Sequence, residues 1–502
     1  MSYVIGIDSS TTATKAVVWD REGRSVAEGR ATFALTSPRP AFHEQDPVDW
    51  WRSTCEAING ALRSVEASEI DAIGLTHQRE TFACLDEQGS ALRPAILWMD
   101  SRAGKQVREH GSEETHRVTG KPPDTTPAFY KLLWLNDNEP DTLKRTRRVV
   151  DVHTYLVQKL TGEWRTTVPC ADPLGLVDLE KGEWSDELIG KVGLGRDQLP
   201  ELFPAGAVLG ELSAEAAEHV GLKAGLPIVG GAGDGQSAGL GANITKPGRA
   251  YLNLGTAVVA GTTSDAYRYD TSFRTMGSPM PGKYTFETLI QGGVLSISWF
   301  LDRVAKVEAH RLALDLEDVD LLEASAIKVG PGADGLLFVP YLAGSQTPYW
   351  NSSARGMMFG LGDHHGRGHF FRAIEEGIAF EQRVQLEGLD ESLDAPVETF
   401  YTMGGGSRSP LWRQIVADIT KRNVVACKEV ETTCLGAGMH AAAAVGWYGS
   451  IEEAAEAMSG EGARHEPDDR AAAQYDKLFE VYKELYPRTS ELHQRLQDAQ
   501  EG

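Results

Sequence analysis

The chain has 502 residues, of which 41% are hydrophobic and 24% are charged, and its formal net charge is −23 at pH 7. This is an ordinary soluble globular composition with room for at least two domains, and the 53 glycines indicate the many tight turns of an alternating α/β architecture. The charge argues against nucleic acid or an anionic membrane surface as a partner, but it leaves room for a small anionic ligand.

The chain opens with a predicted meander of antiparallel strands at residues 4–7, 15–19 and 25–36. The first turn reads DSSTT over residues 8–12. Its backbone N–H groups and Thr hydroxyls could bind a phosphate while Asp8 faces a metal ion. Taken alone, an ordinary polar hairpin is the simpler interpretation.

Two clusters of polar residues then follow predicted strands. A helix begins at Pro47, with Asp46 as its N-cap, and the strand at 70–75 ends in THQRET at 76–81. A similar pattern, AILWMDSR, covers residues 95–102. Charged residues directly behind strand ends are typical of ligand sites in α/β sheets, and an aromatic plane beside donors and carboxylates suits a polyhydroxylated ligand. The alternative is a surface ion-pair cluster with Trp98 in the core.

The middle of the chain, residues 120–225, reads as helices joined by irregular loops and offers little chemistry. The sequence LPIVGGAGDGQSAGLGAN at 226–243 then combines a strand, four glycines and a lone carboxylate, Asp234. Presented into a cleft, Asp234 could take a proton from a hydroxyl of a ligand. A solvated strand-to-helix turn with Asp234 as N-cap explains the stretch equally well.

After Asn243 the opening pattern returns. A strand at 250–254, a Gly255-Thr256 turn and a strand at 257–260 resemble residues 4–19, which suggests two related halves divided into domains 1–243 and 244–502. We expect helices at 294–304 and 370–386, a strand at 399–403 and a charged amphipathic helix from residue 471. The glycines at 404–406 precede a helix starting near Pro410, so a flat ring or a ribose could lie against this backbone.

Other features carry no predicted chemistry. His364, His365 and His369 lie in a Gly-rich loop without a matching carboxylate or cysteine, so we expect a solvated loop rather than a metal site. The five cysteines show no CxxC spacing and are expected to be reduced. We see no leader peptide and no apolar run near the roughly 20 residues that a membrane helix needs, so we expect a cytoplasmic protein.

Together, two Thr-bearing hairpins, a carboxylate for a metal, another for a base, a polar pocket and a glycine turn fit phosphoryl transfer from a nucleotide to a hydroxyl. The chain resembles the FGGY family of carbohydrate kinases from VIGIDSSTTATKA through GGGSRSPLWRQIVADIT. HEQDPVDWW, ILWMDSR and GGGSRSPLWRQ are similar to xylulokinases, whereas HQRET and DGQ are similar to glycerol kinases. The resemblance implies an α/β fold of two actin-like, ribonuclease H-type ATPase domains that close about a hinge over a sugar and MgATP.

The resemblance also implies roles for individual residues. Asp234 would be the general base, and Asp8 would help to hold Mg²⁺. The phosphates of ATP would be bound by Thr11, Thr12, Lys15, Gly255 and Thr256, and the adenosine by Gly404, Gly405 and Ser409. The substrate pocket would be lined by Arg79, Glu80, Trp98, Asp100, Asp234 and Gln236.

Departures from the family pattern leave the substrate open. Xylulokinases carry a Met-His pair where this chain has Arg79-Glu80, and glycerol kinases carry a Tyr where it has Thr126. A ketopentose such as xylulose is our first expectation, with glycerol or a tetritol as the alternative. From another class, a non-catalytic actin-like module would bind nucleotide and sugar without needing Asp234. A nicotinamide-dependent oxidoreductase is rejected because the first turn lacks GxGxxG. A homodimer is possible.

Overall fold

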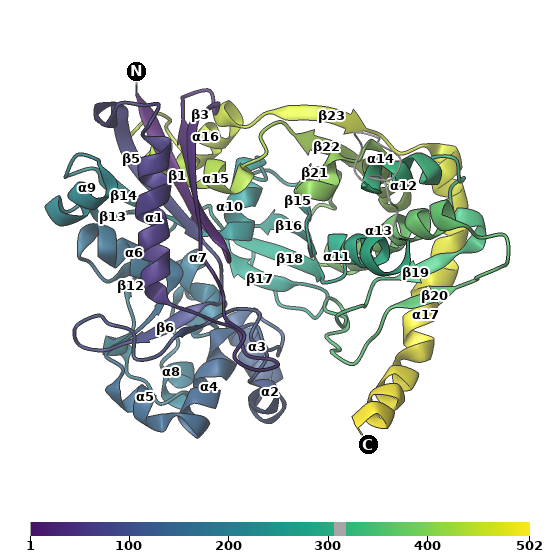
Figure 1. Ribbon diagram of the computed structural model, residues 1–502, viewed down its shortest axis with the longest axis horizontal. Helices are drawn as coiled ribbons and strands as arrows, with labels where there is room; N and C mark the ends of the chain where they lie inside the picture. The colour runs from purple at the N-terminus through teal and green to yellow at the C-terminus, as the bar shows by residue number, and fades with distance from the viewer. Residues whose placement is uncertain (1, 306–317, 502) are drawn as a thin grey trace.

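The computed structural model describes residues 2–305 and 318–501, which form two lobes, each built on a mixed β-sheet (Figure 1). The first sheet has the order β13-β14-β5-β1-β2-β3. Its central strands β1, β5 and β14 are parallel, while β2, β3 and β13 run antiparallel to their neighbours. The bounds are β1 Tyr3–Ser9, β2 Ala13–Trp19, β3 Ser25–Thr32, β5 Ile70–His77, β13 Val208–Glu211 and β14 Pro227–Gly233.

The second sheet has the same strand arrangement as the first sheet, with one additional strand. Its order is β17-β18-β16-β15-β21-β22-β23, in which β15, β21 and β22 are parallel and the others antiparallel to their neighbours. Only β17 has no counterpart, so the weak sequence echo does mark two related halves. The bounds are β15 Arg249–Leu254, β16 Val258–Ser264, β17 Arg274–Gly277, β18 Tyr284–Ile290, β21 Thr399–Met403, β22 Asn423–Cys427 and β23 Glu461–His465.

Helices cover the first sheet on both faces. One face carries α1 Pro47–Ala61, whose N-cap Asp46 accepts from the N–H of Val48, with α6 Val152–Thr161 and α9 Ala214–Val220 beside it. The other face is covered by α15 Thr432–Ala444, and α16 Ile451–Met458 packs on α15. The first sheet is therefore completed by helices from the far end of the chain.

This exchange of helices is reciprocal. Helix α10, Asp234–Gly241, follows β14 and contacts β15 and β16 of the second sheet, whereas α15 follows β22 and contacts β1, β5 and β14 of the first. The two helices pack against each other through glycines. A Cβ on Gly436 would lie 2.0 Å from the carbonyl oxygen of Ser237, and one on Gly241 would lie 2.0 Å from that of Thr432.

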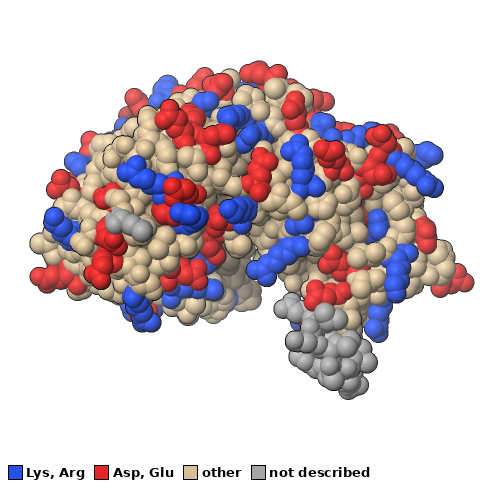
Figure 2. Space-filling view, turned by 90° about the horizontal axis from the view of Figure 1, so that it is seen from above, with Lys and Arg blue, Asp and Glu red and all other residues tan. Residues whose placement is uncertain are grey.

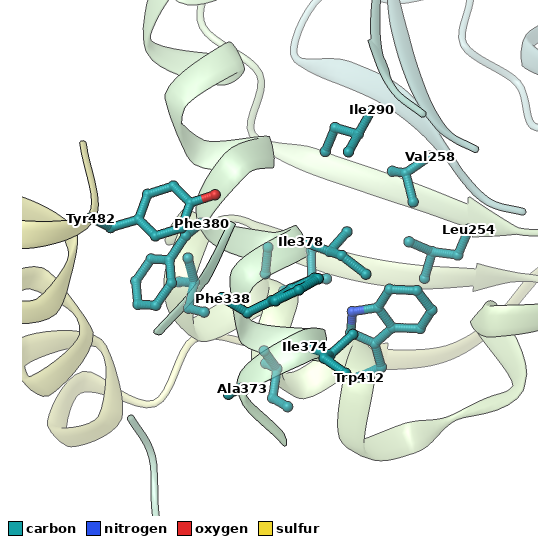
Figure 3. Close-up of a cluster of buried hydrophobic side chains, with 14 of the residues drawn as sticks. Leu254, Val258, Ile290, Phe338, Ala373, Ile374, Ile378, Phe380, Trp412 and Tyr482 are labelled. Atoms are coloured by element: carbon teal, nitrogen blue, oxygen red, sulfur yellow. The ribbon is translucent and has the colours of Figure 1, made fainter. Parts of the chain in front are cut away.

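The second lobe has its core between its sheet and α13, Arg367–Glu391, with α14 Pro410–Thr420 and α17 Asp469–Glu501 alongside (Figure 3). Each large apolar side chain buried here stabilises the fold by about 1.5–3 kcal/mol. Figure 3 labels the central members, among them Leu254, Val258, Ile290, Ile374, Ile378, Phe380 and Trp412. The lobe also contains α11 Val294–Trp299, a π-helical turn Phe300–Val304, α12 Asp318–Ala326 and the strand pair β19 Leu337–Val339 and β20 Met357–Phe359.

A smaller four-stranded sheet extends the first lobe, in the order β4-β7-β6-β8. Its bounds are β4 Glu44–Gln45, β6 Phe82–Leu85, β7 Ala95–Ile96 and β8 Arg148–Asp151. Nearby helices are α2 Gly104–His110, α3 Glu113–Thr119, α4 Ala128–Asn138, α5 Pro140–Arg145, α7 Val168–Ala171 and α8 Asp186–Lys191. Two separate two-stranded sheets also belong to the first lobe: β9 Arg165–Thr167 pairs with β12 Glu201–Phe203, and β10 Val177–Asp178 pairs with β11 Glu183–Trp184.

The structure corrects the sequence prediction in three places. Residues 120–225 contain strands β8 to β13 as well as helices. The apolar run at 95–99 gives only the two-residue β7, and β3 ends at Thr32 instead of residue 36. The predicted helices at 294–304 and 370–386 and the strand at 399–403 are confirmed. All five cysteines are free in this structure. In the part of the chain that the structure describes, no helix is both long and apolar enough to cross a membrane.

Acidic and basic side chains are interspersed over the face in Figure 2, and a notch separates the two lobes there.

Candidate active site

The predicted site residues follow the C-terminal ends of parallel strands, where ligands bind in open α/β sheets. In the first sheet, Asp8 lies near the end of β1, Arg79 and Glu80 follow β5, and Asp234 follows β14. In the second sheet, Gly255 follows β15 and Gly404 follows β21. The fold thus places chemistry-bearing loops at the corresponding edges of both sheets.

Asp234 is the first residue of α10 and has a side chain that is 39% exposed. Gly233 is the N-cap of the helix, so the alternative that Asp234 itself is the N-cap is wrong. Asp234 Oδ1 accepts from the N–H of Gly235 at 2.8 Å and lies 3.0 Å from Arg79 Nε. The carboxylate is therefore fixed through one oxygen while the group still reaches solvent.

Arg79 is buried and bonded on two sides. Its Nη1 lies 3.1 Å from both carboxylate oxygens of Glu287 and 3.4 Å from Gln236 Oε1. Its aliphatic stem passes over Gly233, where a Cβ would lie 2.5 Å from Arg79 Cγ and Cδ. Glycine is thus needed at 233 because the Arg79 side chain packs directly on its Cα. The backbone conformation does not require glycine, because a φ of −63° would suit any residue.

Glu287 on β18 is fully buried and is the anchor of this cluster. It accepts from Arg274 Nε at 2.7 Å and from the hydroxyl of Tyr251 at 2.6 Å, in addition to Arg79. Burial alone would raise the pKa of Glu287, but the charges of Arg274 and Arg79 outweigh it and lower the pKa to about 2. Glu287 is therefore a permanent anion.

Glu80 and Gln236 lie in the same buried cluster. Glu80 Oε1 lies 3.3 Å from Arg274 Nη1, and the backbone of Glu80 has a φ of +58°, a strained conformation for a non-glycine residue that is common at functional sites. Gln236 donates through Nε2 to the carbonyl oxygen of Pro169 at 3.2 Å. The structure thus brings Arg79, Glu80, Asp234 and Gln236 together, as the sequence predicts.

Trp98 is half-buried and contacts the first hairpin, because its indole N–H donates to Thr11 Oγ1 at 3.0 Å. Lys131, fully buried on α4, holds this loop by donating to the carbonyl oxygens of Leu97, Trp98 and Thr126 at 2.7 to 3.1 Å. Burial lowers the pKa of Lys131 to about 8.

Asp100 does not join this cluster. It is fully buried, and its oxygens accept from Arg102 Nε at 2.8 Å, Arg102 Nη2 at 2.7 Å and the N–H of His43 at 2.7 Å. With its acceptor positions occupied in this way, Asp100 orders the loop and has no free oxygen for a substrate. The sequence prediction of a direct substrate contact is not supported.

Asp8 lies where a cation would be expected. Its Oδ1 is buried and has no hydrogen-bond partner among the described residues. Burial, followed by the charge of Asp234, raises the pKa of Asp8 to about 7, while Lys15 lowers it and Glu431 raises it. An unpartnered carboxylate oxygen under anionic repulsion is suited to binding a hard divalent cation.

The remaining predicted residues around the first hairpin differ in their surroundings. Thr12 is exposed, whereas Lys15 Nζ lies 2.6 Å from both carboxylate oxygens of Glu431, just before α15. Lys15 thus pairs with a residue from the far end of the chain and is only about one-third exposed, at 31%.

On the second lobe, Gly255 and Thr256 form the turn before β16, and their carbonyl oxygens accept from the N–H groups of Val294 and Leu295. Gly405 is exposed with open space around it, and Gly404 has a φ of +83°. Ser409 is occupied otherwise: it caps α14 by accepting from the N–H of Trp412, and its hydroxyl donates to Glu323 at 2.7 Å. The glycines, and not Ser409, leave room for a ring.

The histidine loop gains a carboxylate that the sequence did not reveal. His369 Nε2 lies 3.0 Å from Asp334 Oδ2, so the expectation of no matching carboxylate is wrong. His365 and His369 each accept through Nδ1 from the N–H of the glycine three residues earlier, and His369 lies in the first turn of α13 instead of the predicted loop. Within residues 2–305 and 318–501, no three His, Cys, Asp or Glu side chains are grouped to hold a metal ion.

Sequence reasoning missed several residues that lie close to the cluster. Lys121 and Asp172 form a buried ion pair within residues 120–225, where the sequence predicts little chemistry, and Asp172 also accepts from the N–H of Gly277 at 3.0 Å. Arg274 and Glu287 lie opposite each other on β17 and β18. A charge inside an apolar strand, as in YTFETLI, is the signal that could have pointed to Glu287.

Comparisons with known proteins agree with this arrangement. The chain matches the N-terminal domain of the FGGY family of carbohydrate kinases over residues 3–241 and the C-terminal domain over residues 250–445. Among curated proteins it is 30% identical to a xylulose kinase of Bacillus subtilis, covering 99% of both chains, and 29% identical to a gluconokinase of the same organism, covering 100% of this chain and 99% of the other. It is 31% identical to a glycerol kinase of Thermococcus gammatolerans, covering 90% of this chain and 91% of the other.

Two solved structures from Lactobacillus acidophilus superimpose on nearly the whole chain. A gluconate kinase gives a TM-score of 0.92 at 26% identity, covering 99% of both chains. A ligand-bound xylulose kinase gives 0.92 at 25% identity, covering 99% of this chain and 100% of the other. With both domain models matched in order and relatives aligned end to end, the chain belongs to the FGGY family of carbohydrate kinases, phosphotransferases with an alcohol group as acceptor.

Proposed function

We propose that the protein is an ATP-dependent kinase that phosphorylates a hydroxyl of a small neutral sugar, with a ketopentose such as xylulose as the first candidate. The observation that carries this proposal is the half-exposed carboxylate of Asp234, held by Arg79 and close enough to Asp8 for its charge to raise the pKa of that group. This proximity supports the proposal that Asp234 is the base and that residues 8–12 form the first phosphate hairpin.

The reaction needs a base because an alcohol is a poor nucleophile. In this proposal, Asp234 accepts the proton of the sugar hydroxyl while the oxygen of that hydroxyl forms a bond to the γ-phosphorus of ATP. The bond from that phosphorus to the bridging oxygen breaks, and ADP leaves with the electron pair. Thr11, Thr12 and Thr256 are the proposed phosphate contacts, and Gly404 and Gly405 the border of the adenosine. Trp98, Arg79, Glu80 and Gln236 are the proposed walls of the sugar pocket.

The unpartnered Oδ1 of Asp8 fits a role in holding Mg²⁺. Bound there, the ion would neutralise charge on the phosphates.

The charges of the site favour a neutral substrate over an aldonate. Arg79 is bonded to Asp234 and Glu287, Arg274 to Glu287 and Glu80, and Lys121 to Asp172. A substrate carboxylate would have to displace one of these partners. The names of the relatives nevertheless include a gluconokinase and a glycerol kinase, so gluconate, glycerol and tetritols belong in the test.

The test is coupled ADP release with purified protein, ATP and Mg²⁺ over D-xylulose, D-ribulose, glycerol, erythritol and D-gluconate. We expect the highest kcat/KM with a ketopentose. Turnover restricted to glycerol, erythritol or gluconate would reassign the substrate. Sugar binding by calorimetry without turnover on any member of the panel would support the non-catalytic nucleotide- and sugar-binding module instead.

For the domain organisation, we propose a boundary near Asn243, just after α10 ends and before β15 begins the second set of strands.

A further inference from the structure

Among the described residues, Arg79 is the side chain that links Glu287 to the candidate base Asp234. Arg79 Nε lies 3.0 Å from Asp234 Oδ1, and Arg79 Nη1 lies 3.1 Å from both oxygens of Glu287. One guanidinium group therefore bridges the two carboxylates. Because Asp234 follows the first sheet and Glu287 belongs to the second, the bridge also joins the two lobes.

The partners of Glu287 fix the direction of the Arg79 side chain. Glu287 is itself held by Arg274 Nε at 2.7 Å and the Tyr251 hydroxyl at 2.6 Å, both on the second sheet. The stem of Arg79 lies on Gly233, so no side chain at 233 competes for this path. A guanidinium group with a carboxylate at each end has a single well-defined orientation.

Stability alone gives no reason to keep such a cluster. A buried ion pair often adds nothing over well-packed apolar residues of similar volume, while loss of one partner is costly. In this cluster Arg79, Glu80, Arg274 and Glu287 are all buried, and only Asp234, at 39% exposure, presents a charged oxygen towards solvent. The one exposed carboxylate of the cluster is therefore that of Asp234, the proposed base.

We infer that Glu287 is a positioning residue for phosphoryl transfer: from the second lobe it holds Arg79 so that Asp234 is aimed at the sugar hydroxyl. This inference rests on the proposed function. Without the Glu287 charge, Asp234 and Gln236 are the hydrogen-bond and ion-pair partners that remain for Arg79 among the described residues. The guanidinium group can then turn towards Asp234 with both terminal nitrogens. The base then loses its fixed position, and misplacement by about 1 Å costs roughly a hundredfold in rate.

The first experiment compares two matched substitutions. Glu287→Gln keeps the shape and removes the charge. Glu376→Gln does the same to another fully buried glutamate, bonded to Arg372 Nε at 2.7 Å and the Tyr475 hydroxyl at 2.6 Å within the core of the second lobe. We expect Glu287→Gln to lower kcat by at least about 30-fold with the KM for ATP within about twofold of wild type. Glu376→Gln should lose comparable thermal stability and keep kcat within about threefold.

The second experiment is a double-mutant cycle on kcat with Arg79→Met. If Glu287 acts through Arg79, then Glu287→Gln lowers kcat by less than about twofold when Arg79 is already Met. Multiplicative losses, or a folded Glu287→Gln protein with kcat within about threefold of wild type, overturn the inference. They do so while the wild-type sugar panel still supports the proposed function. If wild type turns over no sugar, the proposed function fails and the positioning role fails with it.

Discussion

Arg79 Nε lies 3.0 Å from Asp234 Oδ1, although the two residues follow different strands of the first sheet. The N–H of Gly235 bonds to the same oxygen at 2.8 Å. Both contacts are to Oδ1, and among the described residues no hydrogen bond to Asp234 Oδ2 is found. In the proposed mechanism, Oδ2 is the oxygen that would accept the proton of the sugar hydroxyl.

Replacing Asp234 by Asn removes the proton acceptor and keeps the shape. General-base catalysis contributes about 10²–10⁴-fold, so we expect kcat to fall by at least about a thousandfold. The KM for ATP should change little, because the nucleotide contacts proposed above lie elsewhere. Steady-state ADP release measures the first effect and calorimetry with a non-hydrolysable ATP analogue the second. Full activity in a folded Asp234→Asn protein would exclude this residue as the base.

Replacing Trp98 by Phe keeps an aromatic wall and removes the hydrogen bond to Thr11 Oγ1. One such bond contributes about 1 kcal/mol, which corresponds to roughly a fivefold increase in the KM for the sugar. Trp184→Phe is the control, since that indole N–H donates to the carbonyl oxygen of Pro200 at 2.9 Å, away from the site. Equal effects of the two substitutions on sugar KM would contradict a pocket role for Trp98.

Replacing Asp8 by Asn should raise the Mg²⁺ concentration needed for half-maximal activity by at least about tenfold, because a charged ligand becomes a neutral one. The measurement is kcat against free Mg²⁺ at saturating ATP and sugar. Asp151→Asn is a suitable control: Asp151 is also a buried carboxylate with an unpartnered oxygen, but it caps α6. An unchanged Mg²⁺ requirement in Asp8→Asn would place the ion elsewhere.

His440 on α15 makes the stability of the fold sensitive to acid. Both ring nitrogens are buried without partners among the described residues, and burial lowers its pKa to about 4 from an ordinary value of 6.5. The unfolded chain therefore takes up a proton as the pH falls through 6.5, while the folded chain does not until about pH 4. This group alone should cost about 2 kcal/mol of stability between pH 7 and pH 5.

His440→Leu should keep or raise stability at pH 7, because it replaces unsatisfied polar atoms by an apolar group of similar size. It should also remove that pH-dependent loss. Urea denaturation of both proteins at pH 7 and pH 5 gives the comparison, and the same loss in both proteins would show that His440 is not its source.

The crossing of α10 and α15 should tolerate no added methyl group. A Cβ on Gly436 would lie 2.0 Å from the carbonyl oxygen of Ser237, so Gly436→Ala should cost about 3 kcal/mol or more of unfolding free energy. Gly190→Ala on α8 meets nothing within 4 Å and should be neutral or slightly stabilising. Denaturation midpoints and m-values distinguish the two, and an unaffected Gly436→Ala protein would mean that the helices are further apart.

The sequence predicted those parts of the site that lie directly behind strands. Residues 8–12, 76–81 and 234–236 stand out because polar side chains and glycines interrupt apolar runs at places where an open sheet binds ligands. Asp100 looked the same, yet Arg102, two residues further on, occupies its oxygens. Which partner a carboxylate takes depends on the path of the loop, and composition does not determine that path.

Glu287 and Arg274 could not be predicted in the same way, since they face each other only through the register of β17 and β18. The role of Lys131 in holding the loop around Trp98 could not be predicted either, because its three acceptors are backbone carbonyl oxygens, which every residue carries. The exchange of α10 and α15 between the two sheets could not be predicted from the sequence either, because small residues in a helix do not indicate which sheet the helix will cover.

That exchange has a consequence for how the chain matures. Val4, Val17, Ala72 and Val229 on the first sheet are buried in one cluster with Leu435 and Met439 of α15. During synthesis, this apolar face of the first sheet therefore stays uncovered until α15, which ends at residue 444, has left the ribosome. Cutting the gene in the middle should therefore not yield two independent folding units, because the first lobe needs residues 432–458, which form α15 and α16, to cover this face of its sheet.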